Sequence, residues 1–245
     1  MPVFFIAERH IVQGTLTITG PLLDHLRKSL RVSVGEKLWV GDDQRRRYFI
    51  QVTTMTPREL QGHVLEEREG PLLRHPRVIL AQAILKGDRM DWAIQKATEL
   101  GVASLVPIIS ERVIARPRTE RLGPQQERWQ RIAFEAAQQA ERWEMPEVHA
   151  PTELVPWLRS ATETVKLILS ERSSGGSLDT VSWPKDADSR ILLLIGPEGG
   201  WSAAEREVAH ASGFTEVSLG SRILRAETAA IAALAIIQSR LGELG

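Results

Sequence analysis

Apolar residues follow two different rhythms along this chain of 245 residues. Up to about residue 68, short apolar runs and one alternating run, Thr15 to Thr19, are separated by turn residues, a pattern typical of β-strands. Strands are predicted at residues 3–6, 15–19, 37–40, 48–53 and 60–65, with one short helix at 22–30. Several short strands joined by turns favour a small β-barrel.

From residue 77 onward, apolar strands alternate with helical segments. Continuously apolar runs predict strands at 78–85, 105–109, 165–169 and 191–195, and helices are predicted at 88–101, where Asp88 is the expected cap, and at 124–143. This β-α-β order predicts an α/β fold with a parallel sheet covered by helices on both faces. A charged stretch with Gly and Pro separates the two patterns. We therefore expect two domains, residues 1–70 and 71–245.

The composition is that of a folded protein and excludes several kinds of site. Apolar residues make up 42% and charged residues 25%, and 31 basic side chains balance 31 acidic ones. A nucleic-acid partner would therefore need a local basic patch. The absence of cysteine excludes disulfides and Cys-based metal sites, and no metal is expected. No apolar run is long enough to span a bilayer, so we expect a cytoplasmic protein without a membrane partner.

A strand that runs directly into a glycine-rich turn is the most informative stretch. The run at 191–195 leads into Gly196-Pro-Glu-Gly-Gly200, and Ser202 with Glu205 then forms a predicted capping box. Ligands of parallel sheets bind at the carboxyl ends of strands, where this turn lies. Glu198 does not fit a phosphate cradle. From spacing alone, a ligand-binding turn and a purely structural one remain equally open.

A second stretch, residues 217–229, joins another strand to a helix that is apolar on all sides between 229 and 237. A helix that is apolar on all sides is covered on both faces, either within the core of one chain or at a subunit interface. We favour the subunit interface. The loop before it carries Arg222 and Arg225. Glu227 either places a negative charge at the positive end of the helix or holds Arg225 or a substrate.

These two motifs, in this order, resemble the ribosomal small subunit methyltransferase E family, of the knotted SPOUT class of RNA methyltransferases. The resemblance extends to Lys86 through Val102, to Ser110-Glu-Arg112 and to the N-terminal region around His25 to Arg31, so it covers essentially the whole chain. It implies a deep trefoil knot in the C-terminal domain, an N-terminal PUA-like β-barrel that binds RNA, and an obligate homodimer.

The resemblance also implies the activity: transfer of a methyl group from S-adenosylmethionine to N3 of a uridine in 16S ribosomal RNA of the small ribosomal subunit. Arg225 is our candidate for stabilising the uridine anion, and Glu227 for organising Arg225 or accepting a proton. RNA would be bound by Arg27, Arg31, Lys86, Arg89 and Arg112. The cofactor would contact Leu194, Ile195, Gly196, Glu198, Gly199, Leu219, Gly220, Ile223, Leu224, Arg225 and Thr228.

The chain departs from the family pattern at Ala140 and Glu141, where the family has a small hydroxyl residue and a glycine. Two other functions remain open at this point. One is methylation of a ribose 2′-oxygen by the same fold, and the other is a ribosome-assembly factor that binds RNA without catalysis. A nucleotide hydrolase is disfavoured because the phosphate-binding motifs are missing.

Overall fold

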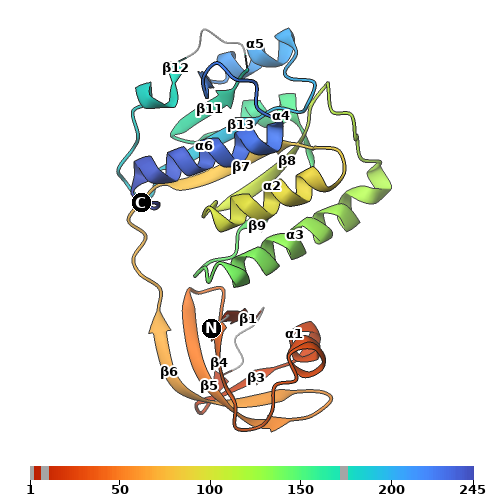
Figure 1. Ribbon diagram of the computed structural model, residues 1–245, viewed down its shortest axis with the longest axis vertical. Coiled ribbons are helices and arrows are strands. Elements are labelled where there is room, and N and C mark those ends of the chain that lie inside the picture. Colours follow the sequence, from red (N-terminus) through yellow and green to blue (C-terminus); the bar gives the residue numbers. More distant parts are fainter. Residues whose placement is uncertain (1–2, 7–10, 172–175) are drawn as a thin grey trace. The chain divides into compact units, whose positions relative to one another are not determined.

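The computed structural model describes residues 3–6, 11–171 and 176–245 and divides into two compact units. The first unit comprises residues 1–72 and 137–145, and the second comprises 73–136 and 146–245 (Figure 1). The segment 137–145 lies in the first unit, although the sequence assigns it to the domain beginning at residue 71.

The first unit is built on a six-stranded sheet in the order β1-β4-β5-β6-β3-β2. Its strands are β1 (Val3–Phe5), β2 (Ile11–Val12), β3 (Thr15–Ile18), β4 (Lys37–Gly41), β5 (Arg46–Met55) and β6 (Leu60–Glu69). Alternate residues of the strands, such as Leu16, Ile18, Leu38 and Val40, form the core of this unit. Helix α1 (Gly20–Asp24) and a π-helical turn (His25–Ser29) cover that core with Leu23 and Leu26, in place of the single helix predicted at 22–30.

The closed barrel expected for this region is not confirmed. Within residues 3–6 and 11–72, no strand pairing joins β1 to β2, the two ends of the sheet. β1 has three residues and β2 has two, so each edge offers few hydrogen-bonding groups. The sheet described is therefore an open one.

Charged contacts hold segment 137–145 within the first unit. The Arg47 guanidinium lies 3.8 Å from the centre of the Trp143 ring and donates a hydrogen bond to the Glu141 carbonyl. Arg45 forms an ion pair of 2.8 Å with Glu144. Burial lowers the pKa of the Arg47 guanidinium. The Arg45–Arg47 cluster therefore contributes to structure in this unit.

The second unit contains a parallel sheet in the order β10-β8-β7-β13-β11-β14-β12, and β9 pairs with β8. Its strands are β7 (Arg77–Ala83), β8 (Ser104–Ile109), β9 (Glu147–Val148), β10 (Thr152–Glu153), β11 (Val165–Leu169), β12 (Gly176–Ser177), β13 (Arg190–Ile195) and β14 (Thr215–Ser218). Every pairing described in it is parallel. The long predicted strands are thus confirmed as parallel strands, with β13 between β7 and β11.

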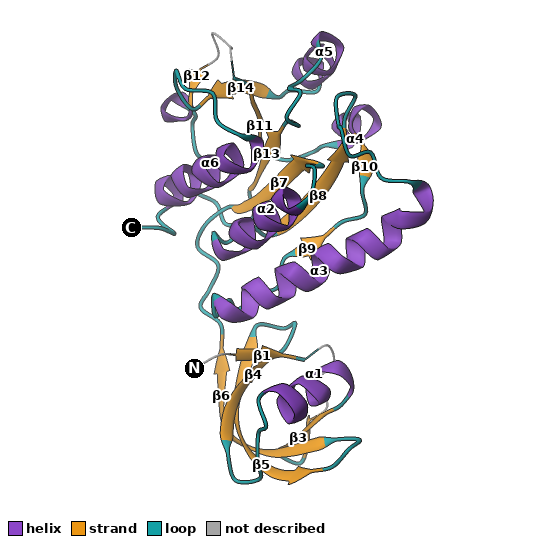
Figure 2. Cartoon of the chain, turned by 45° about the vertical axis from the view of Figure 1, so that its right-hand side comes forward, coloured by secondary structure: helices purple, strands orange, loops and turns teal. Residues whose placement is uncertain are grey.

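Helices cover both faces of this sheet (Figure 2), as predicted. They are α2 (Asp88–Glu99), α3 (Leu122–Gln139), α4 (Leu154–Ser160), α5 (Ala203–Ala211) and α6 (Ala226–Leu241). Side chains of β13 alternate between the two cores. Leu193 packs in the core that contains residues of α2, α3 and α6, while Leu192 and Leu194 pack in the core that contains residues of α4 and α5. The alternation explains why every position of this strand from 191 to 195 is apolar.

Two helix boundaries differ from the prediction. Asp88 is the first residue of α2 and not its cap, because Gly87 occupies the cap position at φ +66° and no side chain caps the helix. The predicted helix at 124–143 ends at Gln139, and Glu141 adopts φ +50°, which is incompatible with continuing the helix.

Candidate functional site

The glycine-rich turn after β13 is formed by contacts too close for larger side chains. A Cβ atom on Gly196 would lie 3.0 Å from the Trp201 ring, and a Cβ on Gly199 would lie 3.0 Å from Cβ of Arg112. Gly200 adopts φ +65°, a conformation that favours glycine. The glycines therefore let the turn fold against the indole ring and against the loop that follows β8.

The residues at the start of α5 and just before it tie this turn to the loop after β8 and to the end of β11. Ser202 Oγ accepts the Glu205 amide, and Glu205 Oε2 accepts the Ser202 amide at 2.8 Å, so the predicted capping box is confirmed. The other oxygen, Oε1 of Glu205, accepts the Glu111 amide at 2.8 Å from the loop after β8. Trp201 Nε1 donates to the Leu169 carbonyl at the end of β11, at 3.0 Å.

The second motif forms the loop between β14 and α6. Gly220 adopts φ +107°, and its amide donates to Ser218 Oγ at 3.2 Å. A Cβ on Gly220 would meet no atom within 4 Å. Among the hydrogen bonds of the described residues, none involves the main-chain groups of Leu224. The loop thus offers free space and unsatisfied main-chain groups to a ligand.

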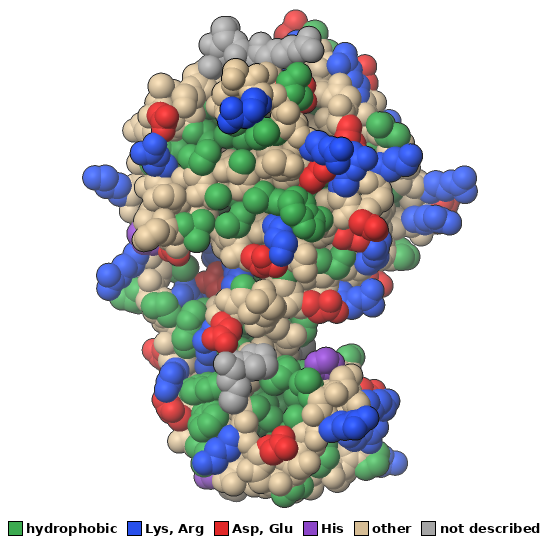
Figure 3. Space-filling model, in the orientation of Figure 1, with side chains coloured by type: hydrophobic (Ala, Val, Ile, Leu, Met, Phe, Trp, Pro, Cys, Tyr) green, Lys and Arg blue, Asp and Glu red, His purple; other side chains and the backbone are tan. Residues whose placement is uncertain are grey.

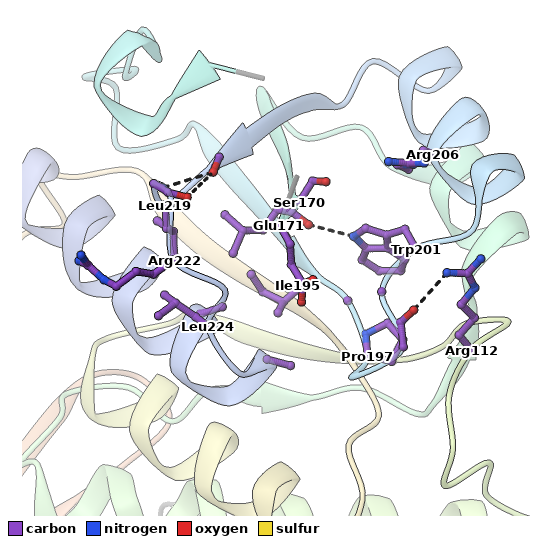
Figure 4. Close-up of a pocket in the computed structure, with 18 residues that line it drawn as sticks. Arg112, Ser170, Glu171, Ile195, Pro197, Trp201, Arg206, Leu219, Arg222 and Leu224 are labelled. Atoms are coloured by element: carbon purple, nitrogen blue, oxygen red, sulfur yellow. Dashed lines mark hydrogen bonds between the residues drawn. The ribbon is translucent and has the colours of Figure 1, made fainter. Parts of the chain in front are cut away.

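The two motifs enclose a cavity of about 230 Å³ at the carboxyl ends of β11, β13 and β14 (Figure 4). Parallel sheets bind ligands at the carboxyl ends of their strands. The strand at the centre of this cavity, β13, lies between β7 and β11, which come from other parts of the sequence. The residues that line it are Arg112, Leu169, Ser170, Glu171, Ile195, Gly196, Pro197, Gly199, Gly200, Trp201, Arg206, Ser218, Leu219, Gly220, Arg222, Leu224, Ala226 and Ala229.

About half of the predicted cofactor contacts lie on the wall of this cavity, namely Ile195, Gly196, Gly199, Leu219, Gly220 and Leu224. Leu194, Glu198, Ile223, Arg225 and Thr228 are not among the lining residues. Leu194 is fully buried in the core on the α4 and α5 side of the sheet, and Ile223 is 60% exposed.

Sequence reasoning missed the wall contributed by β11 and α5. Leu169, Ser170 and Glu171 come from the end of β11, and Arg206 comes from the first turns of α5. The strand at 165–169 was itself predicted, so its carboxyl end carried a usable signal. What the sequence lacked was the strand order, which makes β11 the neighbour of β13.

Glu198 lies in a charged cluster beside the turn. Its Oε1 accepts the Arg89 guanidinium at 3.0 Å and the Lys86 amide at 3.2 Å, while its buried Oε2 has no hydrogen-bond partner. Arg89 and Lys86 are two of the predicted RNA contacts. The charge of Arg89 is therefore compensated within the chain, whereas the Lys86 side chain is exposed.

The two predicted catalytic residues lie at the start of α6 but do not contact each other. Arg225 is exposed and occupies the cap position of the helix. Glu227 is buried, and its Oε2 has no hydrogen-bond partner. In the described part of the chain, no ion pair joins the two side chains. Glu227 lies where the helix dipole favours a negative charge.

Two predicted RNA contacts belong to the first unit. Arg27 lies 3.3 Å from Asp24, and Lys28, with a smaller contribution from Arg27, holds the pKa of the Asp24 carboxyl below its ordinary value. Arg31 is exposed, adopts φ +55° and has no acidic partner in the described ranges. A positive φ is uncommon for an arginine.

Within the three described ranges, no group of three or more His, Asp or Glu side chains could hold a metal ion. Their helices include none that is both long enough and apolar enough to cross a membrane.

Comparison with known proteins gives consistent matches along the whole chain. Residues 73–238 match the RNA methyltransferase domain family. A ribosomal RNA small subunit methyltransferase E from Synechocystis is 35% identical over 240 residues, which cover 96% of this chain and 77% of that protein.

Solved structures agree over the full length. A Neisseria gonorrhoeae ribosomal RNA small subunit methyltransferase E, bound to S-adenosylmethionine, superposes with a TM-score of 0.87 at 32% identity and 98% coverage of each chain. A putative methyltransferase from Legionella pneumophila with the same bound cofactor gives 0.89 at 30% identity and 97% coverage of each chain. The chain belongs to the ribosomal RNA small subunit methyltransferase E family.

Proposed function

We propose that this protein transfers the methyl group of S-adenosylmethionine to N3 of a uridine in 16S ribosomal RNA of the small ribosomal subunit. The observation that carries this is the cavity formed by two glycine-rich motifs at the ends of three parallel strands, in a chain of this family. A ribosomal substrate would place the reaction in the cytoplasm.

The residues of the cavity suit the cofactor. Gly220 leaves space that a Cβ would fill, and Leu224 has free main-chain groups that match the donors and acceptors of an adenine. Leu169 and Ile195 supply apolar walls, and the Glu171 carboxylate suits the cationic part of the molecule. When bound, S-adenosylmethionine supplies an electrophilic methyl group on a sulfonium.

The chain must also deal with the proton on uridine N3. Arg225, exposed at the start of α6, would stabilise the uridine anion as that proton leaves. Glu227 has a buried, unpartnered carboxylate oxygen two residues away and would accept the proton or orient Arg225 once RNA is bound. Arg225→Ala and Glu227→Ala are each expected to reduce kcat about 100-fold, while the cofactor Kd stays unchanged.

Three features of the larger assembly belong to the same proposal. The first unit would be a PUA-like RNA-binding domain that uses Arg27 and Arg31, and the second would contain the trefoil knot. The protein would act as a homodimer, because α6 leaves Ile236 37% exposed and α2 leaves Trp92 44% exposed. Hydrophobic side chains gather over these two helices (Figure 3). Burying such a face requires a second copy or another apolar surface.

The decisive experiment uses small ribosomal subunits from a strain that lacks this methylation. Labelled S-adenosylmethionine is added with the protein, and the nucleosides of the digested RNA are identified by mass spectrometry. N3-methyluridine is the expected product. Label on a ribose would refute the N3 assignment, and cofactor binding without any transfer to subunits would refute catalysis on this substrate.

A further inference from the structure

Two arginines from different elements line the same side of the cavity. Arg112 follows β8, and Arg206 lies in α5, and Figure 4 shows both side chains on the side of the cavity where Trp201 lies. Arg112 donates one hydrogen bond of 3.2 Å to the Gly199 carbonyl. That bond uses Nη1 and leaves further donors of the guanidinium for another acceptor.

The buried carboxylate of Glu205 links the two segments that carry these arginines. Glu205, which directly precedes Arg206, accepts the amide of Glu111, which directly precedes Arg112, at 2.8 Å. Glu205 is 4% exposed and is fixed by the capping box at its other oxygen. This part-buried hydrogen bond from a main-chain amide to a side-chain carboxylate links the segment that carries Arg112 to the helix that carries Arg206.

The charge on the cavity wall is not compensated. The charged lining residues are Arg112, Arg206, Arg222 and a single acid, Glu171. Some arginines elsewhere in the unit form ion pairs, such as Arg116 with Glu153 at 2.6 Å. Across the ranges that the structure describes, no ion pair engages Arg112 or Arg206.

Two arginines that form no ion pair and line one cavity wall suit the binding of an oxyanion. The cofactor offers one carboxylate, but its own sulfonium and ammonium groups already outweigh that negative charge, so the cofactor does not account for two arginines. An RNA phosphodiester carries one negative charge and has no positive group of its own to balance it. We propose that Arg112 and Arg206 form an oxyanion site that holds a phosphodiester of the RNA beside the reacting nucleotide. This inference rests on the proposed function and extends it to the position of the substrate.

The test measures methyl transfer to small ribosomal subunits by Arg206→Ala, by Arg112→Ala and by the double variant. The control is Arg159→Ala, which removes an exposed arginine of α4 that does not line the cavity. Each single variant of the site should raise KM for subunits about tenfold, and make its salt dependence shallower by about one unit. The cofactor Kd, measured by calorimetry, should stay within about twofold of wild type, as should every constant of Arg159→Ala.

Arg206→Lys should raise KM for subunits less than Arg206→Ala does, because lysine keeps the positive charge but cannot form the two parallel hydrogen bonds of a guanidinium. An unchanged subunit KM in Arg206→Ala would overturn the proposal. So would a weaker cofactor Kd with an unchanged subunit KM, since the oxyanion would then be the cofactor carboxylate. An equal rise in KM for Arg159→Ala would also overturn it, by showing a general charge effect. Failure of the proposed function would be seen separately, as absence of transfer by the wild-type protein.

Discussion

Glu205 offers the sharpest test of how the site is held together. Its carboxylate accepts the Ser202 amide within the capping box and the Glu111 amide from the loop after β8, both at 2.8 Å. Ser202 Oγ accepts the Glu205 amide. Glu205→Ala removes one contact of the capping box and also the link to the loop, whereas Ser202→Ala removes the other capping-box contact and leaves the link intact.

The structure gives a magnitude for each change. Loss of the cap contact in Ser202→Ala costs about 1 kcal/mol of unfolding free energy. Glu205→Ala loses a comparable contribution and also leaves the part-buried Glu111 amide without its acceptor, at a further cost of about 1–3 kcal/mol. At roughly 2–4 °C per kcal/mol for a domain of this size, Glu205→Ala should lower the melting temperature at least about twice as much as Ser202→Ala.

Calorimetry of the thermal transition of the second unit measures this difference, and steady-state methyl transfer measures its consequence. Release of the loop should displace Arg112, so Glu205→Ala should raise KM for small subunits as Arg112→Ala does. Ser202→Ala should not. In the double variant Glu205→Ala/Arg112→Ala the two effects on KM should be less than additive, because both act on one contact.

Two results would refute this reasoning. Equal losses of melting temperature in Glu205→Ala and Ser202→Ala would mean that the bond to Glu111 contributes no stability. A wild-type KM for subunits in a folded Glu205→Ala variant would mean that the loop keeps its position without that bond.

Three further substitutions test other parts of the structure. Gly196→Ala places a Cβ 3.0 Å from the Trp201 ring, so we expect a loss of about 1–3 kcal/mol and a weaker cofactor Kd, measurable by chemical denaturation and calorimetry. Gly101→Ala adds a Cβ at φ +85° and 2.9 Å from a side-chain nitrogen of α6, and should destabilise the second unit by more than about 1 kcal/mol with no change in cofactor Kd for the protein that remains folded. Asp42→Ala removes the acceptor of three hydrogen bonds, to the Tyr48 hydroxyl and two turn amides, and should cost the first unit about 2–4 kcal/mol in the same assay.

Much of the second unit could be predicted from the sequence because its signals are local. A run such as 191–195, apolar at every position, predicts a strand buried on both faces, and Leu192 and Leu193 do pack into different cores. The capping box of Ser202 and Glu205 depends on a spacing of three residues, which the sequence displays directly.

Features that depend on strand order could not be predicted. No local pattern shows that β13 lies between β7 and β11, so the wall formed by Ser170 and Glu171 was missed. The end of α3 was extended too far for a similar reason, because residues 137–145 belong to the first unit through contacts of Trp143 and Glu144 with a distant strand. Such tertiary contacts override local helix propensity.

The sequence also does not show which arginines are paired in the folded chain. That pairing decides which positive charges remain available to a ligand. Counted along the sequence, Arg45, Arg47 and Arg89 resemble the arginines of the cavity, and a basic cluster of either kind would suit RNA. The fold separates them: Arg45 and Arg89 have carboxylate partners at 2.8 and 3.0 Å, and Arg47 is buried against Trp143. In a chain with equal numbers of acidic and basic side chains, a cation stays without an ion pair where the nearby carboxylates already accept other hydrogen bonds. Arg206 is such a cation, and because its neighbour Glu205 is already committed to two amides, that carboxylate cannot readily turn to neutralise it. The hydrogen bonds that order the loop are thus the same ones that keep the cavity wall positively charged for an incoming anion.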